Sequence, residues 1–252
     1  MFKYLELKLL RRIRKRFVER RVHIFGHTIF YNDPRSFFSG LRDIFKIKIY
    51  HFSSSKESPV IIDGGGNIGL SVLYFKDIYP ESKITVFEPD LEMLGFLKKN
   101  IAANSLEDVN VVSAGIDLNE GTVKFTPDHS DGGRINAGGK ISVKIDKLSK
   151  YINSEVDFLK LDIEGSELNV LEDLDINGKF KYIRELCLEW HSFSEQKQNL
   201  GKLLMILEKN NYKYFINNLD YRPEKLIKTL SKLRDGTKFY LIIHAKKYDL
   251  LD

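Results

Sequence analysis

The sequence predicts an α/β protein with a parallel sheet and helices on both faces, and two observations lead to this fold class. From residue 59 to residue 191, short apolar segments alternate with segments of helical periodicity, which is the pattern of repeated strand–helix–strand units. The composition is that of an ordinary globular chain, because 42% of the 252 residues are hydrophobic and 30% are charged. We therefore expect one large α/β domain with a short extension.

The sequence has only one cysteine and no long apolar stretch, and both facts limit the kind of protein it can be. The single cysteine, Cys187, excludes an internal disulfide framework and a zinc cluster built on cysteines. No stretch reaches the ~18 charge-free apolar residues of a membrane span, and the charged N-terminus lacks the apolar core of a signal peptide. These features predict a cytoplasmic protein.

The first 21 residues are strongly basic, although the net charge of the whole chain is only +5. Leucines, Ile13 and Phe17 are interleaved with the basic residues, and only Glu6 and Glu19 oppose them. This pattern predicts a basic amphipathic helix that lies on an anionic membrane, peripheral to its inner face, or on another polyanion. A solvated cap helix is the alternative. The basic residues are Lys3, Lys8, Arg11, Arg12, Arg14, Lys15, Arg16, Arg20 and Arg21.

The next segment predicts a hairpin and a second helix. Residues 22–31 alternate between apolar and polar side chains, with a turn at Gly26, and Pro34 begins a helical pattern. We expect residues 1–57 to form an N-terminal extension of basic helix, hairpin and helix, and residues 58–252 to form the main domain.

The main domain begins with a strand over residues 60–63 and a helix over residues 70–79. The last two expected strands, around 212–219 and 238–247, depart from the regular strand–helix alternation and could pair antiparallel. A basic helix and the turn "RDGT" lie between them. Residues 127–140 are rich in Gly, Asp and Ser and predict a long functional loop. The remaining expected strands are 83–90, 109–116, 156–165 and 183–191, and the remaining helices are 91–104 and 195–209.

The loop that follows the first strand is the main candidate for binding a ligand. Gly64, Gly66 and Gly69 fit the G-x-G-x-x-G dinucleotide fingerprint, and a glycine loop that opens a helix presents backbone N–H groups to an anion. Glu88 closes the second strand and can accept both hydroxyls of a ribose. Asp63 would lie poorly beside a pyrophosphate but well beside an ammonium or sulfonium group. This favours S-adenosylmethionine over a nicotinamide dinucleotide, with a simple strand-end cap as the other role for Asp63.

A second group of ionisable residues follows the fourth strand of the sheet, in "VDFLKLDIEGSELNVL". Lys160, Asp162, Glu164 and Glu167 lie at or just after the carboxyl end of this strand, where open α/β sheets bind ligands. For methyl transfer to a hydroxyl, an acidic group there could take the proton. The alternative is that Asp162 orients the loop while Glu164 and Glu167 cap the next helix, which we prefer for Glu167.

Three segments together resemble the FkbM family of S-adenosylmethionine-dependent methyltransferases. They are "IIDGGGNIGLSVLYF", "VFEPDLEMLGFLKKN" and above all "DFLKLDIEGSE", and the similarity extends to "LEWHSF". The resemblance covers roughly residues 24–220, and Gly66 departs from it, because the family more often has alanine there. It implies a Rossmann-like fold with seven strands in the order 3-2-1-4-5-7-6, the last antiparallel. It also implies a hydroxyl acceptor on a sugar, a glycan or a natural product.

Position by position, the resemblance assigns three parts of the cofactor S-adenosylmethionine. Asp63, Gly64, Gly65, Gly66, Asn67, Ile68 and Gly69 would hold the methionine part. Glu88 and Pro89 would hold the ribose. Ala114 and Gly115 would flank the adenine.

For the chemistry we expect Asp162, Glu164, Glu189 and His191 to converge over the methyl group, since the ends of the fourth and fifth strands are neighbours in this fold. His191 is the preferred general base, because its ordinary pKa of about 6.5 leaves it mostly neutral at pH 7. A divalent metal on Asp162, Glu189 and His191 is an alternative that we do not favour. The loop at 127–140 is interpreted as a mobile lid; alternatively its His129 and Arg134 reach the acceptor.

Other functions stay open from sequence alone. A nucleic-acid methyltransferase would suit the basic N-terminus, but the fourth strand ends in Asp-Ile-Glu-Gly rather than the Asn/Asp-Pro-Pro-aromatic element of enzymes that methylate a flipped base, so we expect no nucleic acid partner. A nicotinamide oxidoreductase and a non-catalytic binding protein of the same fold are the remaining alternatives.

Overall fold

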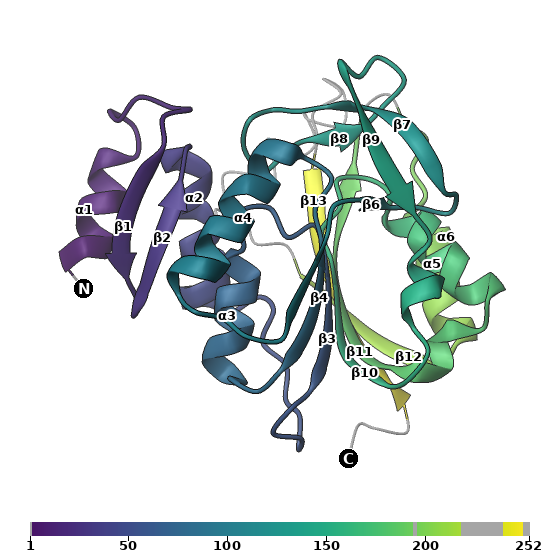
Figure 1. Ribbon diagram of the computed structural model, residues 1–252. Coiled ribbons are helices and arrows are strands. Elements are labelled where there is room, and N and C mark those ends of the chain that lie inside the picture. The colour runs from purple at the N-terminus through teal and green to yellow at the C-terminus, as the bar shows by residue number, and fades with distance from the viewer. Residues whose placement is uncertain (1, 194–195, 218–238, 249–252) are drawn as a thin grey trace.

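A computed structural model describes residues 2–193, 196–217 and 239–248 of the chain. Its centre is a seven-stranded sheet in the order β12-β13-β11-β10-β3-β4-β5 (Figure 1). Only β13 runs antiparallel to its neighbours. The predicted order 3-2-1-4-5-7-6 with an antiparallel last strand is therefore confirmed. The strands are β3 (Val60–Gly64), β4 (Lys83–Phe87), β5 (Val109–Val112), β10 (Val156–Leu161), β11 (Ile183–Ser192), β12 (Tyr212–Asn217) and β13 (Phe239–Lys247).

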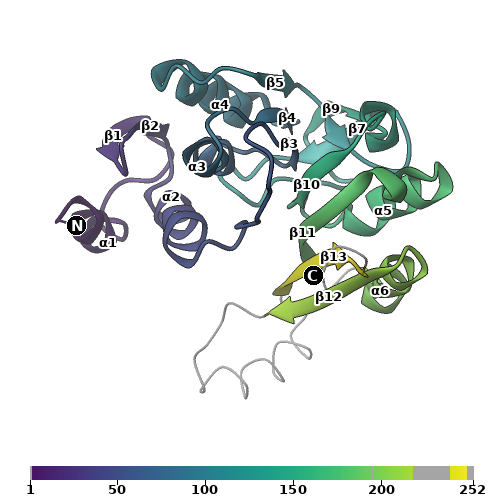
Figure 2. The same cartoon turned by 90° about the horizontal axis from the view of Figure 1, so that it is seen from below.

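Helices cover both faces of this sheet, as the views in Figures 1 and 2 agree. On one face lie α3 (Leu70–Ile78) and α4 (Leu91–Ala103), and on the other lie α5 (Glu167–Ile176) and α6 (Leu200–Lys209). Every residue of β10 is buried, which is the pattern of a central strand covered by helices on both sides. Two short 3-10 turns, η2 (Leu148–Tyr151) and η3 (Lys179–Tyr182), connect the elements on the α5 side.

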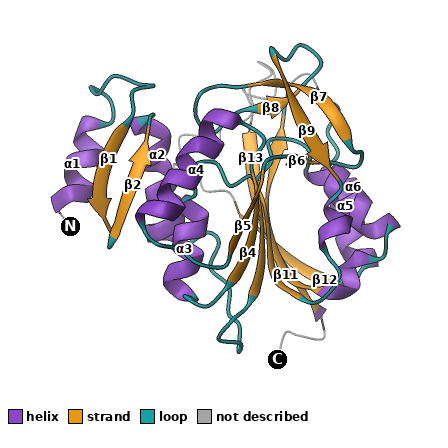
Figure 3. Ribbon diagram, viewed as in Figure 1, coloured by secondary structure: helices purple, strands orange, loops and turns teal. Residues whose placement is uncertain are grey.

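The N-terminal extension packs against the outer side of α3 and α4 (Figure 3). It consists of α1 (Phe2–Leu10), the antiparallel hairpin β1 (Arg20–Ile24) and β2 (His27–Tyr31), α2 (Pro34–Gly40) and the π-helical segment η1 (Leu41–Ile47). The predicted hairpin and the helix start at Pro34 are confirmed. The side chain of Asp33 caps α2 by accepting the N–H groups of Arg35 and Ser36.

The predicted long basic helix is wrong in length, because α1 ends at Leu10. Beyond it the chain is held by the residue that caps α2: Arg16 makes a two-pronged ion pair with Asp33 at 2.9 and 2.8 Å, and Phe17 has a φ of 59°, which a helix cannot contain. The extension therefore shares its core with the main domain, through Leu73 on α3 and Phe96 on α4. The boundary at residue 57 stays a prediction.

A second sheet, which the sequence analysis did not predict, lies between β5 and β10 in the chain. Its four short strands have the order β6-β9-β7-β8, and β8 falls inside the segment that we expected to be an irregular loop. This small sheet lies above the main sheet in Figure 1. Its strands are β6 (Gly115–Ile116), β7 (Gly121–Thr126), β8 (Arg134–Ile135) and β9 (Ile141–Asp146).

Within the described residues, no helix is long and apolar enough to cross a membrane. The expected basic helix before the last strand and the "RDGT" turn at residues 234–237 lie outside the described residues.

Candidate active site

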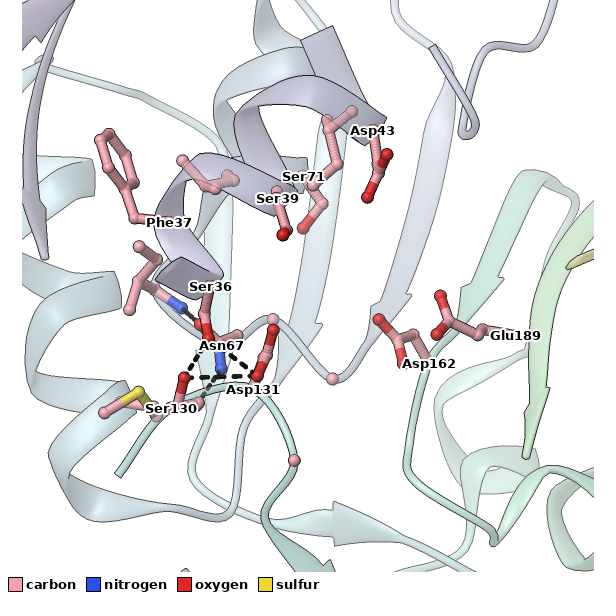
Figure 4. A pocket seen from close by; sticks show the side chains of 18 of the residues that line it. Ser36, Phe37, Ser39, Asp43, Asn67, Ser71, Ser130, Asp131, Asp162 and Glu189 are labelled. Atoms are coloured by element: carbon pink, nitrogen blue, oxygen red, sulfur yellow. Dashed lines mark hydrogen bonds between the residues drawn. The ribbon is translucent and has the colours of Figure 1, made fainter. Parts of the chain in front are cut away.

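Two adjoining hollows lie at the carboxyl ends of β3 and β10. The larger has a volume of about 300 Å³ and the smaller about 80 Å³. Both are lined by Gly65, Asn67, Asp162 and Glu164, so they meet between the glycine loop and the end of β10. Figure 4 shows the larger one, with Asp162 and Glu189 facing each other at one end.

The glycine loop is shaped by close approach of the backbone. A Cβ atom on Gly65, whose φ is +81°, would lie 1.9 Å from the carbonyl oxygen of Asp162. A Cβ on Gly66 would lie 2.2 Å from Cγ2 of Val86. Gly66 therefore does more than add flexibility at the position where the family more often has alanine: beside Val86, this chain has room for hydrogen only.

Behind the loop, Asp63 is fully buried and has a cationic partner within the protein. Its Oδ1 lies 2.9 Å from Nζ of Lys160, and its Oδ2 accepts the hydroxyl of Ser71. Lys160 also donates to the carbonyl oxygens of Gly64, at 3.1 Å, and Gly65, at 2.6 Å. The pair therefore ties β3 to β10 directly beneath the loop. Direct contact of Asp63 with the cofactor stays a prediction.

Glu88 lines the smaller hollow beside Pro89 and Gly115. Its carboxylate accepts the backbone N–H of Asn67 at 2.7 Å and that of Asp90 at 2.8 Å, so it fixes the glycine loop relative to the end of β4. Burial raises the pKa of Glu88 to about 7, while those two hydrogen bonds oppose the rise. Contact between Glu88 and the ribose stays a prediction.

The four expected catalytic residues do converge. Asp162 and Glu164 follow β10, while Glu189 and His191 lie on the adjacent β11. Oε1 of Glu189 lies 3.3 Å from Nε2 of His191, and Oε1 of Glu164 lies 3.5 Å from it. Glu164 has a φ of 54°, and such strained backbone is concentrated at functional sites.

The surroundings of His191 do not fit the expected neutral base. Its Nδ1 lies 3.0 Å from Oε1 of Glu167, so carboxylates approach both sides of the buried ring. Although burial opposes it, hydrogen bonding to Glu167 and Glu189 and the charge of Glu164 hold the pKa of His191 well above its ordinary value. The expectation of a mostly neutral imidazole at pH 7 is corrected, because these carboxylates stabilise its charged form.

The pKa of Glu189 is also raised, but for a carboxyl group this disfavours the charged form. Burial and the charge of Asp162 raise its pKa to about 7, although His191 opposes the shift. Unlike His191, both Asp162 and Glu189 line the larger hollow. Of the four expected catalytic residues, the three carboxylates Asp162, Glu164 and Glu189 thus line the cavity, and the imidazole lies behind them.

One wall of the larger hollow comes from the N-terminal extension, which the sequence analysis did not place at the site. Ser36, Ser39, Arg42 and Asp43 from α2 and η1 line it. Tyr50, which follows η1, donates its hydroxyl to Asp162 at 3.2 Å. No local pattern marks these residues as functional, because the contact joins positions 112 apart in the sequence.

The loop expected to be a mobile lid is hydrogen-bonded over the glycine loop. The carbonyl of Ser130 accepts the side-chain amide of Asn67 at 2.7 Å, and the Ser130 hydroxyl donates to Asp33 at 3.0 Å (Figure 4 shows the Asn67 contact). His129 is directed away, to Glu92 at 2.7 Å, and lines neither hollow. Arg134 stacks on Phe193, 4.3 Å from its ring centre, and lines the smaller hollow.

The expected cofactor residues fall into two groups. Those that line the hollows are Gly65, Gly66, Asn67, Ile68, Glu88, Pro89 and Gly115. Those that do not are Asp63, Gly64, Gly69 and Ala114. Of the second group, Asp63 supports the loop from behind through Lys160, which donates to the carbonyl oxygens of Gly64 and Gly65.

The strand order and the glycine loop define the class of Rossmann-like methyltransferases that use S-adenosylmethionine. The model of the methyltransferase FkbM domain matches residues 63–214, more than half of the chain. The chain therefore belongs to the FkbM methyltransferase family, as its motifs suggested.

Two relatives named as methyltransferases are similar to the chain. Methyltransferase sdnD of Sordaria araneosa is 24% identical over 239 residues, which cover 77% of this chain and 89% of that protein. Methyltransferase 1 of Beauveria bassiana (strain ARSEF 2860) is 23% identical over 214 residues, which cover 73% of this chain and 84% of that protein.

Solved structures share the fold. Methyltransferase FkbM from Methylobacillus flagellatus KT has a TM-score of 0.50 at 17% identity and is matched over 77% of this chain but 45% of its own, so this chain spans less than half of that protein. The StiE O-MT has a TM-score of 0.51 at 9% identity, over 86% of this chain and 77% of its own.

Proposed function

We propose that the protein transfers a methyl group from S-adenosylmethionine to a hydroxyl of a sugar, a glycan or a natural product. The observation that carries this proposal is the continuity of the two hollows: a glycine loop and Glu88 lie at one end, and the carboxylates of Asp162, Glu164 and Glu189 face the cavity at the other. A donor site and a proton acceptor therefore border one space.

The donor end has features that suit the cofactor. Gly65 and Gly66 bring loop backbone to the hollow, because a side chain on either would collide with Asp162 or Val86, and Glu88 presents a carboxylate to which ribose hydroxyls can donate. When bound, S-adenosylmethionine supplies a methyl group on a sulfonium, which leaves as a neutral thioether. The protein therefore has mainly to align the acceptor oxygen and to exclude water.

The acceptor end is polar, which favours a hydroxylated acceptor. Ser36 and Ser39 offer hydroxyls, and Arg42 and Asp43, paired at 2.7 and 2.8 Å, offer a fixed donor and acceptor set. Asp162 and Glu189 can accept the proton that the acceptor hydroxyl loses as its oxygen bonds to carbon. His191 lies behind Glu189 and does not line the cavity.

The test combines binding and product analysis. Calorimetry should show S-adenosylhomocysteine binding and no NADH binding. Incubation with methyl-labelled S-adenosylmethionine and a panel of sugars, glycans and hydroxylated natural products should give label in an ether, which survives mild base. Label released by mild base as a methyl ester, or found on nitrogen, would overturn the hydroxyl assignment.

For the partner, we propose that α1 and the turn after it contact an anionic membrane surface. Leu5, Lys8, Leu9, Arg12 and Ile13 are exposed at helical spacing, with Leu9 75% and Ile13 77% exposed, while Leu7 is buried against the extension. Apolar side chains flanked by cations suit the interface of an anionic bilayer. This supports a peripheral, inner-face location in the cytoplasm.

Co-sedimentation with vesicles tests this contact. The protein should pellet with phosphatidylglycerol vesicles and stay in solution with phosphatidylcholine vesicles, and Leu9→Glu should weaken pelleting. Met205→Glu on α6 is the matched control, since Met205 is 69% exposed outside the basic segment. Equal pelleting of the Leu9→Glu variant and the wild type would refute the proposal.

A further inference from the structure

We propose that Asp162, Glu164 and His191 form a binding site for one divalent cation at the acid end of the cavity. From sequence, a divalent metal on Asp162, Glu189 and His191 was an alternative that we did not favour. Binding of the cation depends only on these side chains; its effect on an acceptor hydroxyl rests on the proposed function.

Three atoms that could bind a cation lie close together at this end of the cavity. One carboxylate oxygen from Asp162, one from Glu164 and a ring nitrogen of His191 all lie within 4.8 Å of one another. Ligand atoms at about 2.1 Å from an octahedral ion are about 3 Å apart when adjacent and about 4 Å apart when opposite. Small rotations of the two carboxylates are therefore enough to close the set around an ion.

His191 adds a nitrogen ligand to this set. The residue is only 4% exposed, and its Nε2 makes no well-aligned hydrogen bond: Oε1 of Glu189 and Oε1 of Glu164 lie 3.3 and 3.5 Å away as ion-pair partners. Buried polar atoms nearly always make a good hydrogen bond, so this loose contact needs an explanation. A cation on Nε2 would replace its proton and bind the facing oxygens directly.

The other ring nitrogen is already prepared for such a role. Nδ1 of His191 lies 3.0 Å from Oε1 of Glu167, a buried carboxylate at the start of α5. Histidines that bind metals almost always donate their second N–H to a carboxylate, a carbonyl or water, which fixes the ring and increases its basicity. Glu167 occupies that position and is therefore a positioning residue.

The ligands sit on rigid parts of the fold. His191 lies on β11, which pairs in parallel with β10 up to the Leu161–Leu188 register, and Asp162 follows β10 directly. Glu164 is held at a φ of 54°, followed by Gly165 at 108°, so a tight left-handed turn presents its side chain. A site assembled by two neighbouring strand ends has little freedom to collapse.

The donor set indicates the kind of ion. Carboxylate oxygens suit Mg²⁺ and Mn²⁺, whereas imidazole suits transition metals, so a mixed set with two oxygens and one nitrogen favours Mn²⁺ or a similar first-row ion. A cation there would bind a hydroxyl or a pair of adjacent hydroxyls and lower the pKa of the bound hydroxyl. Glu189, which is not required as a ligand, would remain to accept the proton.

Manganese itself is the probe. The electron paramagnetic resonance signal of free Mn²⁺ should fall as one equivalent binds to the full-length protein, with no cofactor or acceptor added. Asp162→Asn and Glu164→Gln should abolish this binding. Glu167→Gln should weaken it by about 10- to 100-fold, the usual effect of removing a supporting carboxylate.

Two controls keep the result clear. His129→Ala removes an exposed histidine–carboxylate pair outside the cavity and should leave Mn²⁺ binding unchanged. Circular dichroism should show that each variant is folded; for any that is not, the wild-type titration decides alone. No binding by the wild type at millimolar Mn²⁺, or undiminished binding by folded Asp162→Asn and Glu164→Gln variants, would overturn the site. Because methyl transfer is not measured, failure here is distinct from failure of the proposed function.

Discussion

The two ends of the cavity are built in different ways. At the glycine end the loop backbone forms part of the surface, and its course depends on the absence of side chains from Gly65 and Gly66. At the acid end the surface is made of side chains, and Asp162 and Glu189 bring ionisable oxygens into a largely buried space. The glycine end thus depends on close packing and the acid end on charge. Substitutions at the acid end should therefore lower turnover while leaving cofactor binding largely unchanged.

The largest expected effect is at the glycine end. Gly65→Ala should destabilise the protein by more than about 4 kcal/mol or prevent folding, because the new Cβ would lie 1.9 Å from the Asp162 carbonyl oxygen in a left-handed conformation. Chemical denaturation measures this. Gly95→Ala is the control: Gly95 lies in α4 with nothing within 4 Å of its Cβ position, and it should be neutral or gain about 1 kcal/mol.

At the acid end, Asp162→Asn should lower turnover by about 100-fold or more, since it removes a charge that faces the cavity. Calorimetry with S-adenosylhomocysteine should show nearly unchanged affinity. If the cofactor affinity falls as far as turnover does, Asp162 belongs to the donor end and the division between the two ends is wrong.

Glu88 is an ionisable group at the glycine end, and its effect should depend on pH. Burial raises its pKa from 4.5 to about 7, so the stability it contributes is complete below pH 4.5 and is lost as pH rises through 7. Between pH 5 and pH 8 the wild type should lose about 3 kcal/mol relative to Glu88→Gln.

Thermal unfolding of both proteins across this pH range measures the difference, and effects of all other groups cancel in the comparison. A constant difference between wild type and variant would show that Glu88 does not titrate as a buried group.

The smallest of these effects is expected for Gly66→Ala, at about 1 to 3 kcal/mol, because the neighbour of the new methyl is a side chain, Cγ2 of Val86 at 2.2 Å. The double variant Gly66→Ala/Val86→Ala should recover stability relative to what the two single changes predict together. Strict additivity in denaturation experiments would mean that Val86 is not what excludes the methyl group.

The sequence predicted the parts of the fold that have strong local patterns. The strand and helix succession around the glycine loop was correct, and family motifs identified the strand order. The small sheet was missed because β8 has two residues and a Gly-rich loop precedes it, although Val123, Phe125, Val143 and Ile145 do alternate with polar residues in β7 and β9. The length of α1 was overestimated, since Arg16 is drawn to Asp33 by a tertiary contact that propensity does not contain.

The same limit applies to the site. Acids at strand ends could be predicted, because parallel strands end at a common edge. Their environment could not: the partner of Asp63 is Lys160, 97 residues further along the chain, and the pKa of His191 depends on Glu164, Glu167 and Glu189 together. Nothing in the sequence indicated that Ser36 and Asp43 line one wall of the larger hollow, because no local pattern shows which part of the main domain these residues contact.

That wall joins the N-terminal extension to the hollow in which the proposed acceptor would lie. Several residues between 36 and 50 line the larger hollow, and none of them lines the smaller hollow that contains Glu88. Under the proposed function, changes confined to this stretch are therefore expected to alter the choice of acceptor more than the binding of the cofactor.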